Sequence, residues 1–402
     1  MPRAHKLSVP DSVDATGTFD MTAKLQRFLA SVPDDSVVEF PAGARYQVNG
    51  TLTLKNPQHL TIEGNRAVIV ATSRGDAARS QWRIENGADV IFRDLVVHGA
   101  NPHGGVGKAA YVRKLETQHG FQLEGVQGFE LDRVTVTDTF GDFVYVGRDS
   151  HKVSSTNVWI HDSTFARDGR QGIAVTSASG VIIERNSFTD TRRSTIDLEP
   201  NARSWLVSGV FVLDNVVGKG RLLFVASHGR GPVDDVVISG NRLEGHSLTV
   251  DTVAAENKRR SNWIVTDNVS DTTVRSRPMR FTGIDGLVVR GNRQPVAGGQ
   301  PAAALTDVCG AQVDGNDFGG AAVRSSGRKC AAKLSIPQPP AIAGRPASQI
   351  ALPGPGHQSH TRTVVLWIVG IVAVLSGVVV LVLALRRRRR RRRRSTASEE
   401  SP

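Results

Sequence analysis

The sequence predicts an all-β solenoid, a parallel β-helix in which short strands coil around one long axis. Two observations carry this prediction: a short motif recurs at a nearly constant interval, and no helical pattern lies between its copies. The motif is two or three apolar residues, two polar residues, an asparagine or a substitute, and another apolar residue. Such a period is typical of solenoids, in which each turn buries its apolar side only against its neighbours.

In two copies of the motif, Val134 and Ser163 occupy the asparagine position. From Val134 onward the copies are 29, 23, 29, 26, 27, 24 and 24 residues apart. Asparagine tolerates the left-handed backbone of a bend, and stacked amides can hydrogen-bond along the coil as a ladder. We therefore expect these asparagines to be structural. They are Asn65, Asn186, Asn215, Asn241, Asn268, Asn292 and Asn316.

A helix is expected to cap the first coil, within an N-terminal segment of residues 1–35. Asp20 can N-cap a helix through MTAKLQRFLA, in which Leu25, Phe28 and Leu29 form one apolar face. That face would cover the open end of the coil, which would otherwise invite edge-to-edge pairing. The β-helix is then expected over residues 36–330.

Composition and charge agree with this fold and argue against a nucleic-acid partner. The 40 glycines and 5% aromatic residues suit many short strands and tight turns. The net charge is +12, but residues 386–394 are nine consecutive arginines, so the rest of the chain carries 12 − 9 = +3. A nucleic-acid-binding domain needs a basic stripe on its folded surface, which this nearly balanced body does not predict.

The C-terminal region predicts a membrane anchor. Residues 331–363 are rich in proline and are expected to form a stalk. Residues 364–385 contain no charge and are long enough for a transmembrane helix. The arginine-rich tail, residues 386–402, would stay in the cytoplasm and place residues 1–363 outside the cell. The opening residues lack the apolar stretch of a signal peptide, so we hypothesise a leader upstream of this start.

LPGPG, Leu352 to Gly356, resembles a cell-wall sorting signal of the LPxTG kind, but Pro355 stands where that family has the threonine at which the chain is cut. We therefore expect a retained anchor. Cys309 and Cys330 would form one disulfide outside the cell and would stay reduced inside it.

The opening DATGTFDMTAKLQRFLASVPDDSVVEFPAGARYQVNGTLTL resembles that of the pectate-lyase superfamily of right-handed parallel β-helix proteins. Pro41, Ala42, Gly43 and Tyr46 match the family well, whereas FDMT keeps only part of its acidic element. GRQGIAV and IDLEPN resemble a pair found in bacterial members. The resemblance implies the fold but not the reaction, because the superfamily includes lyases, hydrolases, epimerases and tailspike-like binders.

Four turns of the predicted coil align on Phe121, Val144, Ile173 and Ile196, at steps of 23, 29 and 23 residues. Neighbouring rungs lie about 4.8 Å apart, so the polar residues around these strands would form one strip. The pre-strand positions are His119, Asp142, Gln171 and Ser194. The outward positions are Gln122, Tyr145, Ala174 and Asp197, followed by Glu124, Gly147, Thr176 and Glu199. The small residues among them would leave room for a groove beside the acids.

Carbohydrate chemistry is the function that this strip predicts. Glycoside hydrolysis needs two carboxylates, and Asp197 and Glu199 are candidates for its acid and base. Lyase or epimerase chemistry needs a base and a cation that neutralises a uronate carboxylate. Asp142 and Arg170 complete the catalytic candidates. The expected substrate contacts are His119, Gln122, Tyr145, Gln171, Arg192 and Arg193.

Three interpretations remain open at this point: an extracellular, membrane-tethered lyase or glycoside hydrolase acting on an acidic polysaccharide, a non-catalytic glycan-binding or adhesion module, and a structural spacer. The structural explanation of the charges is a pair of cross-rung ion pairs, Arg170 with Asp197 or Arg193 with Glu199. We expect no cofactor and no protein metal site, although Ca²⁺ can bridge carboxylates and an acidic sugar. The expected partner is a polysaccharide, bound by a monomer.

Overall fold

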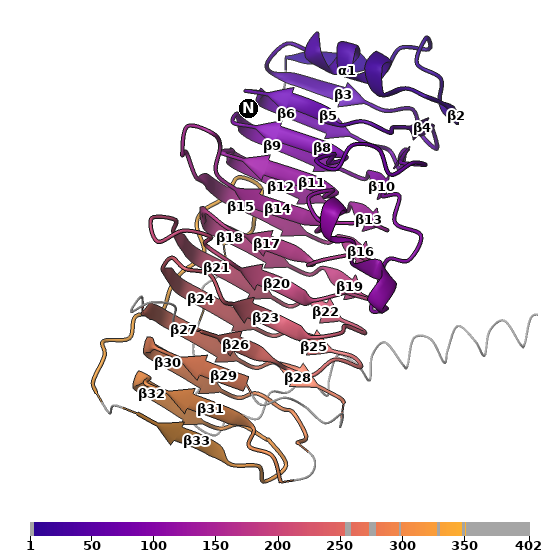
Figure 1. The fold of residues 1–402 in the computed structure, drawn as a ribbon. Helices are drawn as coiled ribbons and strands as arrows, with labels where there is room; N and C mark the ends of the chain where they lie inside the picture. The colour runs from indigo at the N-terminus through magenta and orange to yellow at the C-terminus, as the bar shows by residue number, and fades with distance from the viewer. Residues whose placement is uncertain are drawn as a thin grey trace, which may run out of the picture. The chain divides into compact units, whose positions relative to one another are not determined.

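The computed structural model describes residues 4–253, 259–272, 279–296, 299–327, 330–347 and 350. These residues form a parallel β-helix, which confirms the predicted fold (Figure 1). Successive coils stack three short strands on those of the coil before, so that the described chain has three parallel sheets of 12, 10 and 11 strands. We call them sheets A, B and C.

The strands of sheet A, in sheet order, are β1 (His5–Ser8), β3 (Ser36–Glu39), β6 (Gln58–Glu63), β9 (Ala88–Arg93), β12 (Gln127–Asp132), β15 (Ser155–His161), β18 (Ala178–Glu184), β21 (Val207–Leu213), β24 (Val233–Ser239), β27 (Arg260–Thr266), β30 (Ile284–Arg290) and β32 (Cys309–Asp314). Those of sheet B are β2 (Thr16–Asp20), β4 (Arg45–Gln47), β7 (Val68–Val70), β10 (Val96–His98), β13 (Thr135–Thr137), β16 (Thr164–Ala166), β19 (Ser187–Thr189), β22 (Val216–Val217), β25 (Arg242–Leu243) and β28 (Val269–Ser270).

Sheet C carries the candidate site. Its strands are β5 (Leu52–Lys55), β8 (Trp82–Glu85), β11 (Phe121–Glu124), β14 (Val144–Gly147), β17 (Ile173–Val175), β20 (Ser194–Leu198), β23 (Leu223–Ser227), β26 (Val250–Thr252), β29 (Met279–Thr282), β31 (Ala303–Thr306) and β33 (Val323–Ser326). Inward side chains of all three sheets fill one continuous core, as expected when each coil buries its apolar residues against its neighbours.

The predicted asparagine ladder is present. The main-chain N–H of Asn186 donates to Asn215 Oδ1 at 2.9 Å, and the N–H of Asn215 donates to Asn241 Oδ1 at 3.0 Å. The left-handed residue of each bend is the one before the ladder position, such as Arg185 (φ 54°) and Asp214 (φ 51°). Asn65 (φ 48°) is itself left-handed, and its assignment to the ladder is wrong: Ala67 takes that position before β7, and Asn65 Nδ2 donates to Phe40 O instead. The other asparagines therefore serve the ladder more than the bend itself.

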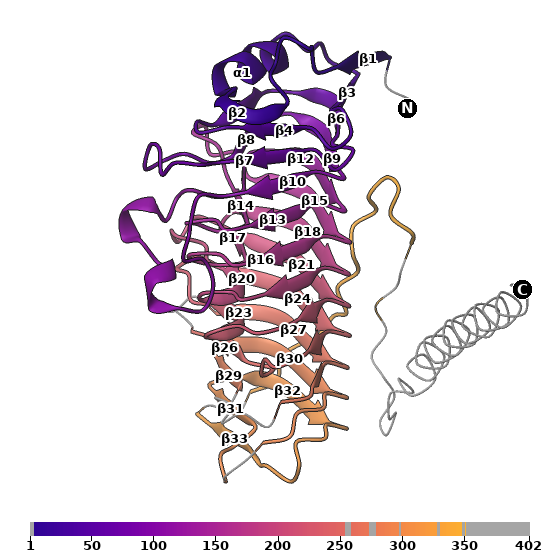
Figure 2. The same cartoon turned by 90° about the vertical axis from the view of Figure 1, so that its right-hand side faces the viewer.

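Helix α1, Thr22–Ala30, lies at the N-terminal end of the stack, as predicted (Figure 2). Leu25 and Leu29 are buried, and Phe28 packs against the same core. The N-cap position belongs to Met21 rather than to Asp20, because the helix begins one residue later than expected. Asp20 Oδ1 still accepts the N–H of Thr22, at 2.9 Å.

The proline-rich segment, expected as a stalk, returns along the outer face of sheet A in its described part. We call residues 331–347 and 350 the strap. Leu334, Ile342 and Ile350 cover a second apolar cluster on that face. The cluster consists of Trp159, Ile182, Phe211, Leu213, Val237, Ile264 and Val288.

A buried ion pair fixes the strap. Arg345 Nη2 lies 3.0 Å from Glu184 Oε2 and its Nε lies 3.1 Å from Oε1, with both side chains almost fully buried. Ser335 N also donates to Asn262 Oδ1 at 3.1 Å. Just before the strap, a disulfide joins Cys309 and Cys330.

Among the described residues, no helix combines the length and the apolar composition that a membrane crossing needs. The predicted transmembrane helix at 364–385 and the tail at 386–402 lie outside the described residues, as does the LPGPG sequence.

Candidate functional site

The four aligned strands are neighbours in sheet C, in the predicted register. Phe121 pairs with Val144, Val144 with Ile173, and Ile173 with Ile196, and all four side chains belong to the core. The residues that follow them therefore form one column on the outer face of β11, β14, β17 and β20. We call the outward residues of these strands, together with the pre-strand residues, the polar strip.

The pre-strand residues also share one line. The N–H of Asp142 donates to His119 Nδ1 at 3.1 Å, that of Gln171 to Asp142 Oδ1 at 3.0 Å, and that of Ser194 to Gln171 Oε1 at 3.1 Å. Each side chain thus satisfies a main-chain donor of the next rung, which would otherwise be buried without a partner. His119 and Gln171, predicted to contact substrate, are already engaged in holding the coils together.

Arg170 is the electrostatic centre of the strip. Its Nη1 lies 2.9 Å from Asp142, its Nη2 3.4 Å from Glu199 and its Nε 3.8 Å from Glu116. The sequence-based alternative paired Arg170 with Asp197, but the guanidinium instead joins three other carboxylates from different rungs and loops. These attractive charges raise the pKa of Arg170, with Asp142 contributing most.

Asp142 and His119 are buried beneath this cation. Asp142 has no solvent exposure, and burial raises its pKa to about 6 against the lowering effect of Arg170. Burial lowers the pKa of His119 to about 3, so its imidazole is neutral at physiological pH. Although His119 Nδ1 lies 3.3 Å from the Asp142 carboxylate, it accepts a main-chain proton, and the contact is not an ion pair.

Asp197 is more enclosed than the sequence suggests. Its residue exposure is 4%, so the expectation that both acids face open solvent is wrong for this residue. Burial, together with the like charge of Glu199, raises the pKa of Asp197 to about 7. Gln171 Nε2 donates a hydrogen bond to Asp197 Oδ2. Near neutral pH, Asp197 therefore carries a proton for much of the time, which is the state required of a general acid.

Small residues flank Asp197 on both sides. Ala174 on β17 and Ala226 on β23 are its partners in the neighbouring rungs. Glu199 directly follows β20 and its side chain is 31% exposed, so a bound molecule can reach it more easily than Asp197. The pair therefore combines one enclosed carboxyl group with one accessible carboxylate.

Gln122 and Tyr145 occupy the outward column but are held by neighbours. Ser80 Oγ donates to Gln122 Oε1 at 2.6 Å, and Gln122 Nε2 donates to Glu124 Oε1 at 2.8 Å. The ring of Tyr145 stacks on His119 at a centroid distance of 5.1 Å. Both residues are partly exposed and stay candidates for substrate contact.

Arg192 and Arg193 lie just before β20, at the amino edge of sheet C. The N–H of Arg192 donates to Asp168 Oδ1 at 2.6 Å, and burial together with nearby arginines lowers the pKa of its guanidinium. Arg193 lies over the ring of Tyr111, 4.9 Å from its centroid. The Arg193–Glu199 pair that the sequence suggested is absent from the ion pairs of the described chain.

Sequence reasoning missed the long loop of residues 99–120, which includes two short 3₁₀ turns, Lys108–Ala110 and Arg113–Leu115. It brings Tyr111 and Glu116 to the amino edge of the polar strip, where Tyr111 Oη donates to Glu116 at 2.6 Å. A signal was present: Trp82 and its partner Phe121 are 39 residues apart, against 23 to 29 for the following rungs.

Charged groups also extend beyond the predicted rungs. Asp251, on β26, lies two rungs past Asp197 and pairs with Arg280, and His228 Nε2 lies 3.6 Å from it. A cavity of about 220 Å³ lies between α1 and the first coils, lined by residues such as Gln26, Leu29 and Leu54, and not over the strip. The groove beside the acids stays a prediction.

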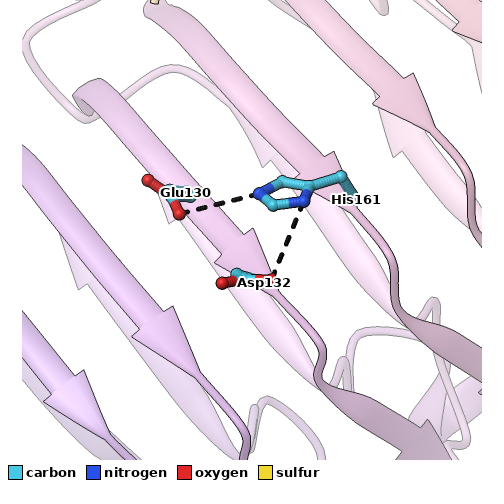
Figure 3. A group of neighbouring side chains, drawn as sticks. All are labelled: Glu130, Asp132 and His161. Atoms are coloured by element: carbon cyan, nitrogen blue, oxygen red, sulfur yellow. Dashed lines mark ion pairs between the residues drawn. The ribbon is translucent and has the colours of Figure 1, made fainter. Parts of the chain in front are cut away.

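A second group of titratable residues lies on the outer face of sheet A (Figure 3). Glu130, Asp132 and His161 offer ligand atoms within 4.8 Å of one another. However, Glu130 faces Nε2 of His161 at 3.6 Å, whereas Asp132 faces Nδ1 at 3.8 Å. Nδ1 lies 2.7 Å from Asp162, and Arg93 binds both Glu130 and Asp132. These contacts fit an ion-pair network better than a metal centre, whose ligands converge on one point.

Comparison with known proteins identifies the fold. The family model described as "right handed beta helix region" matches residues 85–276. No curated protein matches the chain.

Among solved structures, the surface adhesin PfbA of Streptococcus pneumoniae is similar to this chain, with a TM-score of 0.53 and 14% sequence identity. The alignment covers 82% of this chain and 93% of the PfbA chain. A mutant tailspike protein of E. coli bacteriophage HK620, solved with a pentasaccharide, is similar with a TM-score of 0.54 and 14% sequence identity. That alignment covers 80% of this chain and 63% of the tailspike chain. At these identities the similarity concerns the fold alone.

Proposed function

The chain is a right-handed parallel β-helix protein, and from that premise we propose that it binds an acidic polysaccharide across the polar strip and hydrolyses it there. One observation carries the proposal: Asp197, with a pKa raised to about 7, stands two positions before the accessible Glu199 on the same strand face. A protonated acid beside a second carboxylate is the pair that glycoside hydrolysis requires.

In the proposed reaction Asp197 donates its proton to the glycosidic oxygen as the bond to the sugar breaks. Glu199 acts on the opposite side of the sugar, either as the base that activates water or as the nucleophile. Residues i and i+2 of a strand have Cβ atoms about 6.5–7 Å apart, which suits a pair of groups acting across one bond.

Asp142 and Arg170 are positioning residues in this proposal, although the sequence suggested direct catalytic roles. Asp142 has no solvent exposure and cannot touch a substrate. It anchors Arg170, which in turn lies against Glu199 and fixes the orientation of that carboxylate. Gln171 holds Asp197 in the same way.

Hydrolysis is favoured over elimination because of the charge around Arg170. A lyase or epimerase needs a cation that neutralises the carboxylate of a uronate at the reacting carbon. Arg170 already faces Asp142, Glu199 and Glu116 and has little charge left for a substrate. Arg192 and Arg193, at the edge of the strip, are suited to hold an acidic sugar farther from the chemistry.

A non-catalytic glycan-binding or adhesion module is the second candidate. The low exposure of Asp197 and its hydrogen bond to Gln171 favour it, because both also suit a structural carboxyl group. The two comparison structures do not separate the candidates, since one is a surface adhesin and the other is a tailspike protein solved with a pentasaccharide.

We place the β-helix outside the cell, as a monomer tethered by residues 364–385, with the arginine tail in the cytoplasm. The Cys309–Cys330 disulfide supports an oxidising compartment. Two carboxylates can hydrolyse a glycoside without a cofactor, so the proposal includes none; Ca²⁺ could contribute only to binding an acidic glycan. Protease treatment of intact cells, followed by fractionation, tests this topology: the β-helix should be cut while the tail stays protected.

The decisive assay incubates the protein with a panel of uronate polymers and neutral polymers, and follows both new reducing ends and ultraviolet absorbance. Hydrolysis produces reducing ends without the absorbance of an unsaturated uronate. Asp197→Asn is expected to lower the rate by about 100-fold or more, the usual share of a general acid. Glu199→Gln should have a comparable effect, while Glu244→Gln, an exposed acid next to sheet B, should have none.

Three other outcomes are informative. If each cleavage also produces the ultraviolet absorbance of an unsaturated uronate, the reaction is an elimination and not a hydrolysis. Binding without turnover on any polymer would favour the adhesion module. Full activity of Asp197→Asn would remove this residue from the mechanism.

A further inference from the structure

The carboxyl edge of sheet C carries an arginine–aromatic pair that the proposed reaction does not use. Arg148 follows β14, and Trp205 lies in the loop after β20. The Arg148 guanidinium lies over the Trp205 ring, 4.3 Å from its centroid. The pair is close in the chain to the catalytic candidates, since Glu199 directly follows β20, the strand after which the Trp205 loop begins.

The loop that carries Trp205 is held firmly. The N–H of Trp205 donates to Ala202 O at 3.0 Å, and the N–H of Arg230 donates to Pro200 O at 2.7 Å. Gly231 approaches so closely that a Cβ there would lie 2.1 Å from Trp205 O. The main chain that carries the indole is therefore fixed in advance, which lowers the entropy lost when a ligand packs on Trp205.

This edge also exposes apolar side chains, which are uncommon on the described surface. Val153 is 45% exposed and Leu206 43%, and they flank Arg148 and Trp205 in the two loops. They are two of the five large apolar side chains that the described residues leave exposed. Isolated exposed residues need no explanation, but here Leu206 directly follows a half-buried tryptophan that has a cation on its face.

The opposite edge repeats the arrangement. Arg193 lies over Tyr111 at 4.9 Å, so the carboxylates of the polar strip have an arginine–aromatic pair at each edge of the sheet. The five residues of β20 separate the two edges by roughly 16 Å. A sugar chain that contacts the strip would therefore meet one such pair on either side.

We infer that Arg148 and Trp205 form a subsite for a uronate residue of the polysaccharide, next to the cleavage site. The indole face and its apolar neighbours suit the C–H face of a sugar ring, and the guanidinium suits the sugar carboxylate. This inference rests on the proposed function, and it specifies the substrate as an acidic sugar at this position rather than a neutral one.

The test measures binding in an Asp197→Asn background, where the polymer stays intact. Retardation in gels containing polygalacturonate, alginate or a neutral glucan gives the affinity of each variant. Trp205→Leu should weaken binding to the uronate polymers about tenfold, the scale of a well-placed aromatic contact. Arg148→Gln should weaken uronate binding several-fold and leave any binding to the neutral glucan unchanged, because only the charge is lost.

Matched controls come from other faces of the molecule. Phe19→Leu alters an exposed aromatic residue on β2, and Arg242→Gln alters an exposed arginine on β25. Neither should change retardation. Trp205→Phe keeps an aromatic face and should recover most of the affinity, which separates a contact from a folding defect.

The outcomes distinguish this inference from the proposed function. Equal retardation of the Asp197→Asn protein and its Trp205→Leu derivative would overturn the subsite while leaving the function intact. Equal weakening on neutral and uronate polymers by Arg148→Gln would overturn the uronate assignment. Retardation that depends on Trp205, without turnover by the wild-type protein, would support the subsite and contradict hydrolysis. No retardation on any polymer would contradict both.

Discussion

Two buried carboxyl groups of the same solenoid, Glu130 on the outer face of sheet A and Asp197 on that of sheet C, have pKa values shifted in opposite directions. On sheet A, burial raises the pKa of Glu130, but the neighbouring His161 and the hydrogen-bonded Arg93 outweigh it and lower the pKa overall. The pKa of Glu184 is also lowered, because Arg345 and Arg185 outweigh the effect of its burial. On sheet C, burial prevails and the pKa of Asp197 rises to about 7.

The difference lies in the partners of each acid rather than in the sheet: against the effect of burial, His228 and Arg280 lower the pKa of Asp251, which is also on sheet C. The strap covers part of sheet A with apolar side chains. It also supplies Arg345, whose positive charge pairs with the buried carboxylate of Glu184. On sheet C, Arg170 binds Asp142 and Glu199 but leaves Asp197 to an uncharged amide. A charged cluster is therefore no sign of function in itself. The informative feature is a buried acid that its surroundings do not neutralise with a cation.

The pH dependence of stability should expose this contrast most strongly. The pKa of Asp197 is about 7 in the folded state, above its ordinary value of 3.8, so its burial costs stability above pH 7 and the cost vanishes toward pH 4. Asp197→Asn removes this cost. Its stability relative to the wild type should thus improve by about 3 kcal/mol between pH 4 and pH 8, measured by urea unfolding. A flat difference would contradict the raised pKa.

Glu130→Gln should have the opposite dependence. The lowered pKa of Glu130 means that its carboxylate stabilises the fold above its ordinary pKa of 4.5, and that this stabilisation is lost as the pH falls through the folded pKa. The free energy of unfolding of the variant should be about 2 kcal/mol lower than that of the wild type at pH 7, and the difference should be smaller at pH 3. The proposed hydrolytic activity should not change. A loss that grows toward acid would contradict the assignment.

Arg345→Ala tests whether the strap is what completes sheet A. The variant leaves Glu184 with Arg185 and the indole of Trp159, so the expected loss is about 1.5 kcal/mol. Limited proteolysis should cut the strap sooner than in the wild type. Arg324→Ala, at an exposed position of β33, is the control and should have neither effect. An unchanged rate of strap cleavage would show that the ion pair does not hold it.

Arg193→Gln should give the smallest effect. Its cation–π contact with Tyr111 is partly exposed and worth about 0.5–1 kcal/mol, so binding of a uronate polymer should weaken about two- to fivefold. The free energy of unfolding should stay within about 0.5 kcal/mol of the wild-type value, as it does for most surface substitutions. A larger loss of stability would assign Arg193 to the fold instead.

Much of the fold could be predicted because it depends on local chemistry. Alternating apolar residues at nearly equal steps specify which rungs meet, and they placed Ile173 and Ile196 in register correctly. The asparagine ladder and α1 follow from bend chemistry and an apolar helix face.

The parts that could not be predicted depend on segments far apart in the chain. Arg345 meets Glu184 across 161 positions, and no period relates the two. The loop of residues 99–120 was visible only as an overlong interval. The burial of Asp197 also needs the structure, since alternation tells which face a residue occupies but not what covers that face.

The central claim concerns the proton on Asp197, and a carboxyl carbon titration by NMR tests it most directly. Protein labelled with ¹³C at the aspartate carboxyl group, with Asp197→Asn and Asp142→Asn used for assignment, reports each acid separately. We expect Asp197 to titrate near pH 7 and Asp142 near pH 6. Titration of Asp197 below pH 4.5 would show an ordinary ionised carboxylate and would contradict its role as the proton donor.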